Sequence, residues 1–290
     1  MNQLKLAVSG AQILFVAFGA MVLVPLLTGL NPALALLGAG LGTLLFQITT
    51  KRKVPIFLGS SFAFIAPIIY SVGEWGLPST MFGLFAAGFM YFVFAALIRW
   101  RGLAAVHKLL PVAVAPAIEH IGGIMAIGNV TGKDYTKDPG LDKTLTGDGL
   151  GVCVAGLIGG PPVTTYGEVT GAVMITKNSN PVIMTWAAVF AVCMAFFGKF
   201  NAFLASIPMP VMGGIMLLLF GTIASLGVKT LIDAKVDLML PKNLVIVSSV
   251  LTTGIGGMTL KLGSFSFAGV GLCAVLAIML NSLLPDPKES

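Results

Sequence analysis

The chain contains very few charged residues. Only 10% of its 290 residues are Asp, Glu, Lys or Arg, whereas 57% are hydrophobic and the mean hydropathy is +0.98. In soluble domains about a quarter of all residues are charged, so this composition excludes a soluble globular protein. The apolar segments are unbroken runs of roughly 17 to 22 residues rather than short alternating ones, which favours spanning helices over a membrane barrel. The sequence therefore predicts an all-α polytopic membrane protein.

Residues for enzymatic or metal chemistry are also scarce. The three cysteines, Cys153, Cys193 and Cys273, lie in apolar segments without metal-type spacing, so we interpret them as small hydrophobic residues. No catalytic triad, phosphate-binding loop or metal motif is present, and we predict no enzyme activity, metal or cofactor. The net charge of +6 comes from basic residues scattered between apolar segments, a pattern typical of cytoplasmic loops rather than of nucleic-acid binding.

We expect about eleven membrane segments, two of them short and broken. The first is interpreted as a retained span, because it is longer than the core of a signal peptide and lacks a clear cleavage site. The segments at 54–72 and 164–176 begin with polar or β-favouring residues before a short helix, which predicts the two broken helix/strand elements. The expected segments are 6–30, 33–50, 54–72, 80–100, 109–130, 149–159, 164–176, 181–197, 206–227, 243–256 and 267–284.

The basic loops predict a topology that is interrupted in the middle of the chain. Residues 51–53 (Lys-Arg-Lys) place their loop and the N-terminus in the cytoplasm, and residues 99–108 mark a second cytoplasmic loop. A span that starts there must end outside, yet segment 109–130 leads into a loop with Lys133, Lys137 and Lys143. We therefore predict that an odd number of spans is missing before Pro111.

An internal repeat supports the same prediction. The motifs at 31–34, 40–42 and 60–62 recur in the same order at 138–141, 149–151 and 164–166. Two copies separated by an odd number of spans are inverted in the membrane, an architecture in which transporters place broken helices and a substrate site near the midplane. After its short segment the second copy continues for four spans and the first for only one, so the first repeat is expected to be truncated.

Two carboxylic acids at membrane depth are the candidate ligand-binding groups. A charged side chain at a helix centre costs roughly 2.5 to 3.5 kcal/mol on insertion scales, so Glu119 and Glu168 need a compensating role. They can accept hydrogen bonds from ligand N–H groups, and burial allows proton binding to be coupled to ligand binding. The alternatives are a protonated, packed carboxyl for Glu119 and a loop carboxylate at a helix entrance for Glu168.

Further candidate groups surround these carboxyls. Backbone N–H groups near Phe62 and Gly167 begin broken helices, so no preceding turn satisfies them and they can donate to ligand carbonyls. A planar solute with alternating N–H and C=O groups fits this set. Tyr166, Phe62 and Phe64 are candidates for stacking on the ring, with ordinary packing as the alternative. His120 points about 100° away from the preceding residue on a helix, which favours a structural or proton-relay role.

Four motifs, in this order, resemble the nucleobase/ascorbate transporter family, and within it the bacterial uracil permeases. The resemblance covers nearly the whole chain. It implies proton-coupled uptake of uracil across the bacterial inner membrane by a protein, usually dimeric, of about fourteen spans in two inverted repeats, divided into a core and a gate domain. The motifs are Gly59-Ser60-Ser61-Phe62-Ala63-Phe64, Ala117-Ile118-Glu119-His120-Ile121-Gly122, Thr164-Thr165-Tyr166-Gly167-Glu168 and Pro208-Met209-Pro210-Val211-Met212-Gly213-Gly214.

The resemblance also implies roles for individual residues. Glu119 and Glu168 would hold the uracil ring through its N–H groups, the backbone near Phe62 and Gly167 would meet its carbonyls, and Tyr166 would line the pocket. We assign proton coupling to Glu119 and His120. The chain departs from the family pattern at three positions, which are Gly123 in place of a histidine or aspartate, Val169 in place of an asparagine, and Phe220 in place of a pocket tyrosine.

The largest departure is the length. Leu109-Leu110-Pro111 resembles both the approach to the family's fifth span and the start of its eighth, as though about three gate spans were missing between them. We expect a first repeat at 1–110, second-repeat core spans at 111–205, second-repeat gate spans at 206–285 and a polar tail at 286–290. The alternatives are a purine, xanthine or anion transporter of the same architecture, and a non-transporting binding or structural membrane protein.

Overall fold

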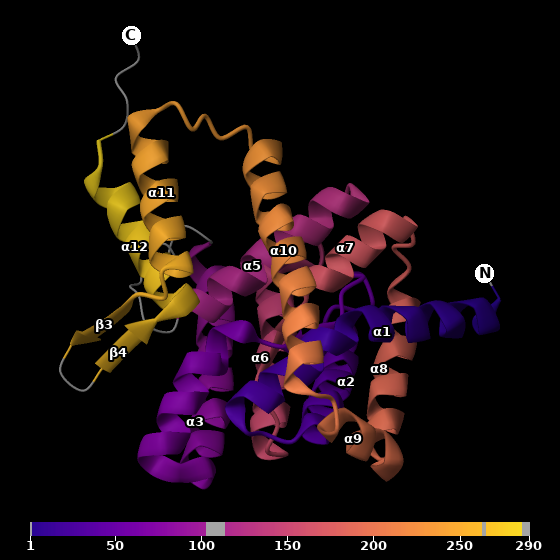
Figure 1. Ribbon diagram of the computed structural model, residues 1–290. Coiled ribbons are helices and arrows are strands. Elements are labelled where there is room, and N and C mark those ends of the chain that lie inside the picture. Colours follow the sequence, from indigo (N-terminus) through magenta and orange to yellow (C-terminus); the bar gives the residue numbers. More distant parts are fainter. Residues whose placement is uncertain (1, 103–113, 263–264, 286–290) are drawn as a thin grey trace.

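The computed structural model describes residues 2–102, 114–262 and 265–285, and it is mostly helical (Figure 1). Leu109-Leu110-Pro111, the predicted boundary between 110 and 111, and the tail at 286–290 lie outside the described residues. The elements are α1 (Gln3–Thr28), α2 (Pro32–Thr49), β1 (Leu58–Ser60), η1 (Phe62–Phe64), α3 (Ile65–Arg101), α5 (Val114–Thr131), η2 (Thr136–Gly140), α6 (Leu141–Leu157), β2 (Val163–Thr165), α7 (Gly167–Thr176), α8 (Pro181–Ala195), α9 (Gly198–Ala205), α10 (Met209–Asp233), α11 (Pro241–Ile255), β3 (Thr259–Leu262), β4 (Phe265–Ala268) and α12 (Gly269–Leu283).

Asn-Pro pairs start two of the core helices. The Asn31 side chain accepts a hydrogen bond from the Ala33 N–H at 2.8 Å, and the Asn180 side chain accepts one from the Val182 N–H at 3.0 Å. In each case proline follows at the first helical position, where its missing N–H costs nothing. These caps fix the predicted starts of the second and eighth segments to within two residues.

Helices α1, α2, α3, α6 and α8 pack into one bundle, and α2 crosses α6 closely. A Cβ atom added to Gly42 would lie 3.1 Å from the Gly151 Cα and 3.0 Å from a Val163 methyl group. Small residues at the crossing let the two backbones approach, as in other membrane helix pairs. The crossing therefore places both helices directly against the strand that contains Val163.

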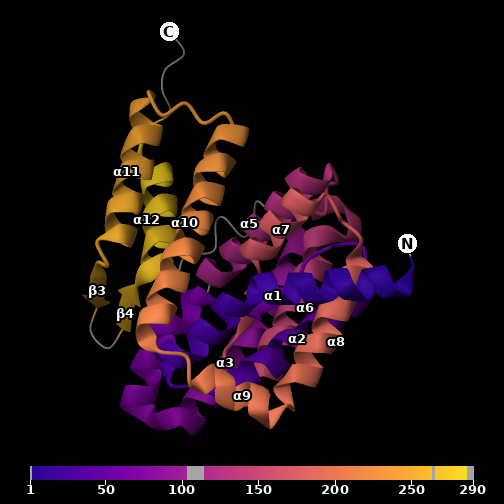
Figure 2. The ribbon, with the colours of Figure 1, turned by 45° about the vertical axis from the view of Figure 1, so that its right-hand side comes forward.

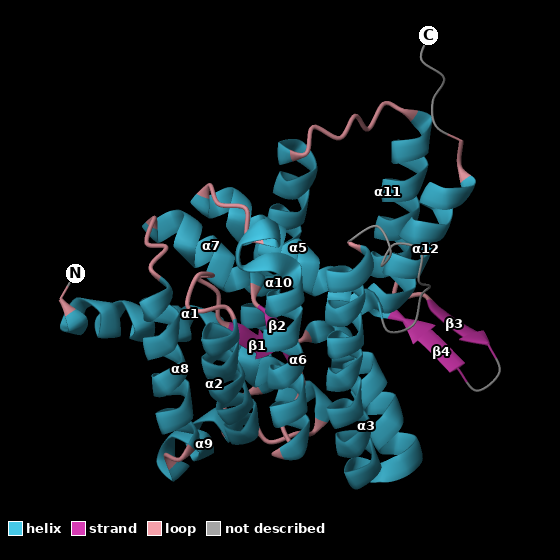
Figure 3. Ribbon diagram, turned by 180° about the vertical axis from the view of Figure 1, so that it is seen from behind, coloured by secondary structure: helices cyan, strands magenta, loops and turns pink. Residues whose placement is uncertain are grey.

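The two predicted broken elements pair with each other at the centre of the protein. Strands β1 and β2 are antiparallel, with Gly59 opposite Thr164, and Figure 3 shows them enclosed by helices. Side chains of α2 hold the first element. The Thr43 hydroxyl accepts the Leu58 N–H at 2.9 Å, and the Gln47 amide donates to the carbonyls of residues 54 and 56 at 3.0 and 3.1 Å. The prediction of two broken helix/strand elements is confirmed.

The predicted break between the segments at 54–72 and 80–100 is confirmed, because Gly76, with a φ of 77°, divides α3 into two helices. Two other predicted boundaries were wrong. Helix α6 begins at Leu141 rather than at 149, because its polar first turns lower the local hydropathy although they are largely buried. The last segment was expected to start at 267, but Phe267 lies in β4 and the helix begins at Gly269. Pairing with β3 explains this difference.

Fewer of the described helices are long enough to span a membrane than the about eleven segments predicted from the sequence. Among the described residues, three helical stretches are long and apolar enough to cross a membrane, at Gln3–Thr28, Pro32–Thr49 and Phe62–Arg101. The pair formed by α8 and α9 adds a fourth if it is taken as one span bent by 91°. The structure is that of a polytopic membrane protein, and the total of about eleven segments stays a prediction.

Helices α11 and α12 form a pair beside the bundle, and α10 lies between this pair and the bundle (Figure 2). Helix α11 packs on α12, and α12 contacts α5 and η1, while α10 contacts α1 and α7. These three helices lie within 206–285, and the assignment of that range as gate spans stays a prediction. Their contacts with α5, α7 and η1 place them next to both broken elements.

Two basic loops lie on the same side of the protein. Lys53, at the end of the first basic loop, forms an ion pair with Asp138 in the loop between α5 and α6, at 2.5 Å.

We expect Arg52→Cys and Lys137→Cys, each in a cysteine-free background, to react with a membrane-impermeant maleimide from the same side of sealed vesicles. Glu74→Cys, at the turn of α3, should react only from the other side. Opposite labelling of positions 52 and 137 would contradict this arrangement.

Candidate functional site

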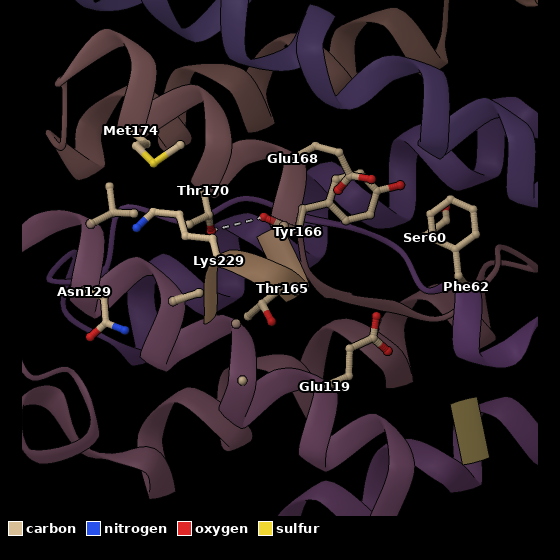
Figure 4. A pocket seen from close by; sticks show the side chains of 16 residues that line it. Ser60, Phe62, Glu119, Asn129, Thr165, Tyr166, Glu168, Thr170, Met174 and Lys229 are labelled. Atoms are coloured by element: carbon tan, nitrogen blue, oxygen red, sulfur yellow. Dashed lines mark hydrogen bonds between the residues drawn. The ribbon is translucent and has the colours of Figure 1, made fainter. Parts of the chain in front are cut away.

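A cavity of about 520 Å³ lies between the paired strands, α5, α7 and α10. It brings together Phe62, Glu119 and residues 166–168, which were predicted to bind the ligand and come from three distant parts of the chain (Figure 4). Its lining residues are Ser60, Phe62, Glu119, Gly122, Gly123, Ala126, Asn129, Val130, Thr165, Tyr166, Gly167, Glu168, Thr170, Met174, Gly227 and Lys229.

Glu119 lines the cavity and contacts the first broken element. It lies on α5 and is partly buried, and one of its carboxylate oxygens accepts a hydrogen bond from the Ser61 hydroxyl at 3.0 Å. Ser61 directly precedes η1. The protonation and the position of this carboxyl are therefore linked to the position of the broken helix.

Glu168 approaches the same cavity from the second broken element. It lies in the first turn of α7 and is only 6% exposed, and its Oε1 atom has no hydrogen-bond partner among the described residues. A carboxylate near a helix N-terminus is favoured by the helix dipole. Figure 4 shows Glu168 and Glu119 reaching the cavity from different sides. The predicted pair of carboxyls is thus assembled in one place.

Tyr166 is held by the strand pairing and by a close glycine. Its N–H donates to the Phe57 carbonyl at 3.2 Å, and its side chain is 3% exposed. A Cβ atom added to Gly59 would lie 2.5 Å from two atoms of the Tyr166 ring, so a side chain at position 59 would displace the ring. The glycine at position 59, in the first motif, therefore leaves room for the aromatic ring of Tyr166 in the third motif.

The helix N-termini at the cavity carry no side-chain caps. Tyr166 precedes α7 and Ser61 precedes η1, and neither side chain accepts a hydrogen bond from the helix that follows. The first N–H groups of a helix have no intrahelical acceptor. Gly167, a cavity-lining residue, lies in the first turn of α7, and the binding of its N–H to a ligand carbonyl stays a prediction.

Several buried polar atoms without hydrogen-bond partners line this cavity. Within the described residues, four of its lining side chains contain such an atom, namely Ser60 Oγ, Thr165 Oγ1, Tyr166 Oη and Glu168 Oε1. Buried polar groups are normally hydrogen-bonded, because an unmade bond costs about 1–3 kcal/mol. A cluster of unsatisfied oxygens in one cavity is the pattern of a binding site for a polar ligand.

His120 faces away from the cavity, as its helical position predicted. It is fully buried, and its Nδ1 atom lies 2.9 Å from Asp148 Oδ2. The same oxygen accepts a hydrogen bond from the Thr164 hydroxyl at 3.0 Å. Sequence reasoning missed Asp148, although a lone aspartate within the glycine-rich residues 147–151 was a usable signal.

We expect Asp148→Ala to destabilise the protein. The substitution leaves the His120 ring and the Thr164 hydroxyl buried without their partner, at a cost of about 3 kcal/mol. Asp142→Ala, in the first turn of the same helix, is the matched control and should cost less than about 1 kcal/mol. Thermal unfolding in detergent measures both. Equal effects would show that the buried contact contributes nothing specific.

Two other predicted positions have structural roles. Phe64 is buried among Leu30, Ile68 and Leu84 and is not part of the cavity wall, whereas Phe62 is. Val169 is fully buried in the main core. The stacking hypothesis therefore applies to Phe62 and Tyr166. Among the residues described, no group of three or more His, Cys, Asp or Glu side chains is placed to hold a metal ion.

The comparison with known proteins agrees with this architecture. The model of the Permease family matches residues 4–117 and 103–263, so the two matches share 103–117. A probable uracil permease of Pasteurella multocida (strain Pm70) is 42% identical over 399 aligned positions, which cover 100% of this chain and 96% of the relative. The uracil permeases of Bacillus caldolyticus and Escherichia coli (strain K12) are 34% and 29% identical, with 96% and 93% of this chain and 92% and 89% of the relative covered.

The apolar helices are those of a multi-pass membrane protein, and the match to the Permease family indicates a transport protein rather than an enzyme. The chain belongs to the Permease family. The alignment with the Pasteurella protein has 399 positions although this chain has 290 residues, so part of that relative has no counterpart here.

Proposed function

We propose that this protein binds uracil, or a closely related nucleobase, in the cavity between the two broken elements. The observation that carries the proposal is the concentration of two carboxyls and several unpartnered hydroxyl groups in one buried cavity. The printed names of the relatives, uracil permeases, favour this base over others. Under this proposal the protein resides in a bacterial inner membrane as a homodimer.

The groups in the cavity match the edges of uracil. The ring has two N–H donors and two carbonyl acceptors. Glu119 and Glu168 accept the N–H groups, and the backbone N–H groups at Gly167 and near Phe62 donate to the carbonyls. Tyr166 and Phe62 supply apolar surface for the ring faces. A site of this kind rejects a base with a different order of donors and acceptors, because buried groups are then left unpaired.

Proton coupling is assigned to Glu119 and His120. Glu119 faces the ligand and is bonded to Ser61 at the other broken element, so its protonation can be coupled both to binding and to the relative position of the two elements. His120, the next residue, contacts the buried Asp148 behind the site.

We further propose that the chain lacks part of the gate of the first repeat. The overlap of the two family matches at 103–117 and the length of the alignments support this, as does the parity of the basic loops. Lys53 and Asp138 pair on one side of the protein, which requires an even number of membrane crossings between them. Three segments are expected there, at 54–72, 80–100 and 109–130, so the count is odd. Alternating access moves one domain against the other, so a chain without half of its gate binds substrate but carries it poorly.

A ligand panel tests the proposed substrate. We expect uracil to raise the thermal unfolding temperature of the detergent-solubilised protein at a lower concentration than xanthine, and sulfate to have no specific effect. Stabilisation follows from binding to the folded state alone. A greater response to xanthine would assign the protein to purines, and a response to sulfate alone would overturn the nucleobase assignment.

A further inference from the structure

Thr165 is a cavity residue that no motif-based role explains. It ends strand β2 opposite Leu58 and is 4% exposed. Its hydroxyl has no hydrogen-bond partner within the described part of the chain. In Figure 4 its side chain lies below Tyr166 and to the left of Glu119. A buried hydroxyl at the cavity wall without a partner calls for a ligand that supplies one.

Gly123 makes the room for this hydroxyl. A Cβ atom added to Gly123 would lie 2.5 Å from Thr165 Oγ1 and 3.2 Å from Thr165 Cβ. These separations are shorter than a van der Waals contact, so any other residue at 123 would push the threonine side chain out of its place. Gly123 lies one helical turn after Glu119 and also lines the cavity. The Thr165 hydroxyl can therefore occupy its position only because residue 123 has no side chain.

We propose that the Thr165 hydroxyl is a further ligand-binding group, which hydrogen-bonds the base at the edge nearest α5. A hydroxyl can both donate and accept, so it can pair with either a ring N–H or a ring carbonyl. No internal hydrogen bond has to be broken before the ligand bond forms. The strand pairing with β1 fixes the backbone of Thr165, which orients the side chain before the ligand arrives.

Thr165→Val and Thr165→Ser test this inference, which rests on the proposed function. Valine keeps the branched shape and removes the hydroxyl, whereas serine keeps the hydroxyl. Titration calorimetry with uracil should show an affinity about tenfold lower for Thr165→Val. The Thr165→Ser protein should bind within about threefold of the unsubstituted chain, because the hydrogen bond is retained. The unfolding temperature without ligand shows whether each variant is folded.

The outcomes separate the two proposals. If the unsubstituted chain binds uracil and Thr165→Val binds it equally well, the hydroxyl is only packed and the inference is wrong. If the unsubstituted chain binds no nucleobase, the proposed function fails as well. If Thr165→Val does not fold, the uracil affinity of Gly123→Ala tests the inference instead, because the added methyl group would displace the Thr165 hydroxyl. Lower affinity in Gly123→Ala with normal affinity in Thr165→Ser supports the inference, and normal affinity in Gly123→Ala overturns it.

Discussion

Replacing either cavity glutamate with glutamine is expected to weaken uracil binding by about 10- to 100-fold, the range for loss of a hydrogen bond to a charged group. Glu168→Gln exchanges a carboxylate oxygen for an amide. If the NH₂ group of the glutamine faces the uracil ring, it opposes a ring N–H, so that two hydrogen-bond donors meet in a buried site. Glu119→Gln has the same effect on the ligand and also changes the acceptor of the Ser61 hydroxyl. Calorimetric titration of each variant with uracil measures the loss.

Glu74→Gln is the matched control for this experiment. Glu74 is exposed at the turn of α3, outside the cavity wall, so its substitution should leave the affinity unchanged. Ligand-free unfolding temperatures of the three variants identify any loss that comes from misfolding. Full affinity in both Glu119→Gln and Glu168→Gln would show that the cavity is not the uracil site.

The second large effect concerns transport. We expect vesicles containing this chain to accumulate no uracil above protein-free vesicles under an inward proton gradient. Insertion of the segment of the Pasteurella relative that lacks a counterpart here, at the junction within 103–117, should restore accumulation. The physical reason is that alternating access requires a gate surface on both repeats against which the core can move.

The inserted chain with Glu168→Gln is the control for that experiment. It restores the gate but removes a ligand group, so it should again accumulate no uracil. If the chain without the insertion accumulates uracil, the proposal that its gate is incomplete is wrong. If the insertion has no effect although the protein folds and binds uracil, the missing residues are not what prevents transport.

The sequence predicted the parts of the structure that depend on local signals. The short polar starts of the two broken elements, the Asn-Pro helix starts at 31 and 180, and the position of Glu168 in the first turn of a helix are all found. Such features follow from capping, hydropathy and the properties of proline, which act within a few residues. The internal repeat was inferred from motifs of the same local kind, and its inversion in the membrane stays a prediction.

The features that were missed depend on partners distant in the sequence. Asp148 is buried in contact with His120 and Thr164, and although its glycine-rich neighbours mark the position as unusual, they do not indicate which residues it contacts. The first turns of α6 are polar, so a hydropathy reading starts the helix too late. The β3–β4 hairpin was taken as loop and helix, because strand pairing is not visible in an apolar run. The contact of Gly123 with Thr165 joins α5 to a strand and needs the fold itself.

Equilibrium dialysis of the purified chain against radiolabelled uracil tests the central claim most directly. The site described above predicts saturable binding of about one uracil per chain, because one cavity holds one ring. Unlabelled uracil should displace the bound label, and the Glu119→Gln/Glu168→Gln double variant should retain none. Saturable binding that persists in the double variant, or its absence from the folded unsubstituted chain, would contradict the assignment of this cavity as a uracil site.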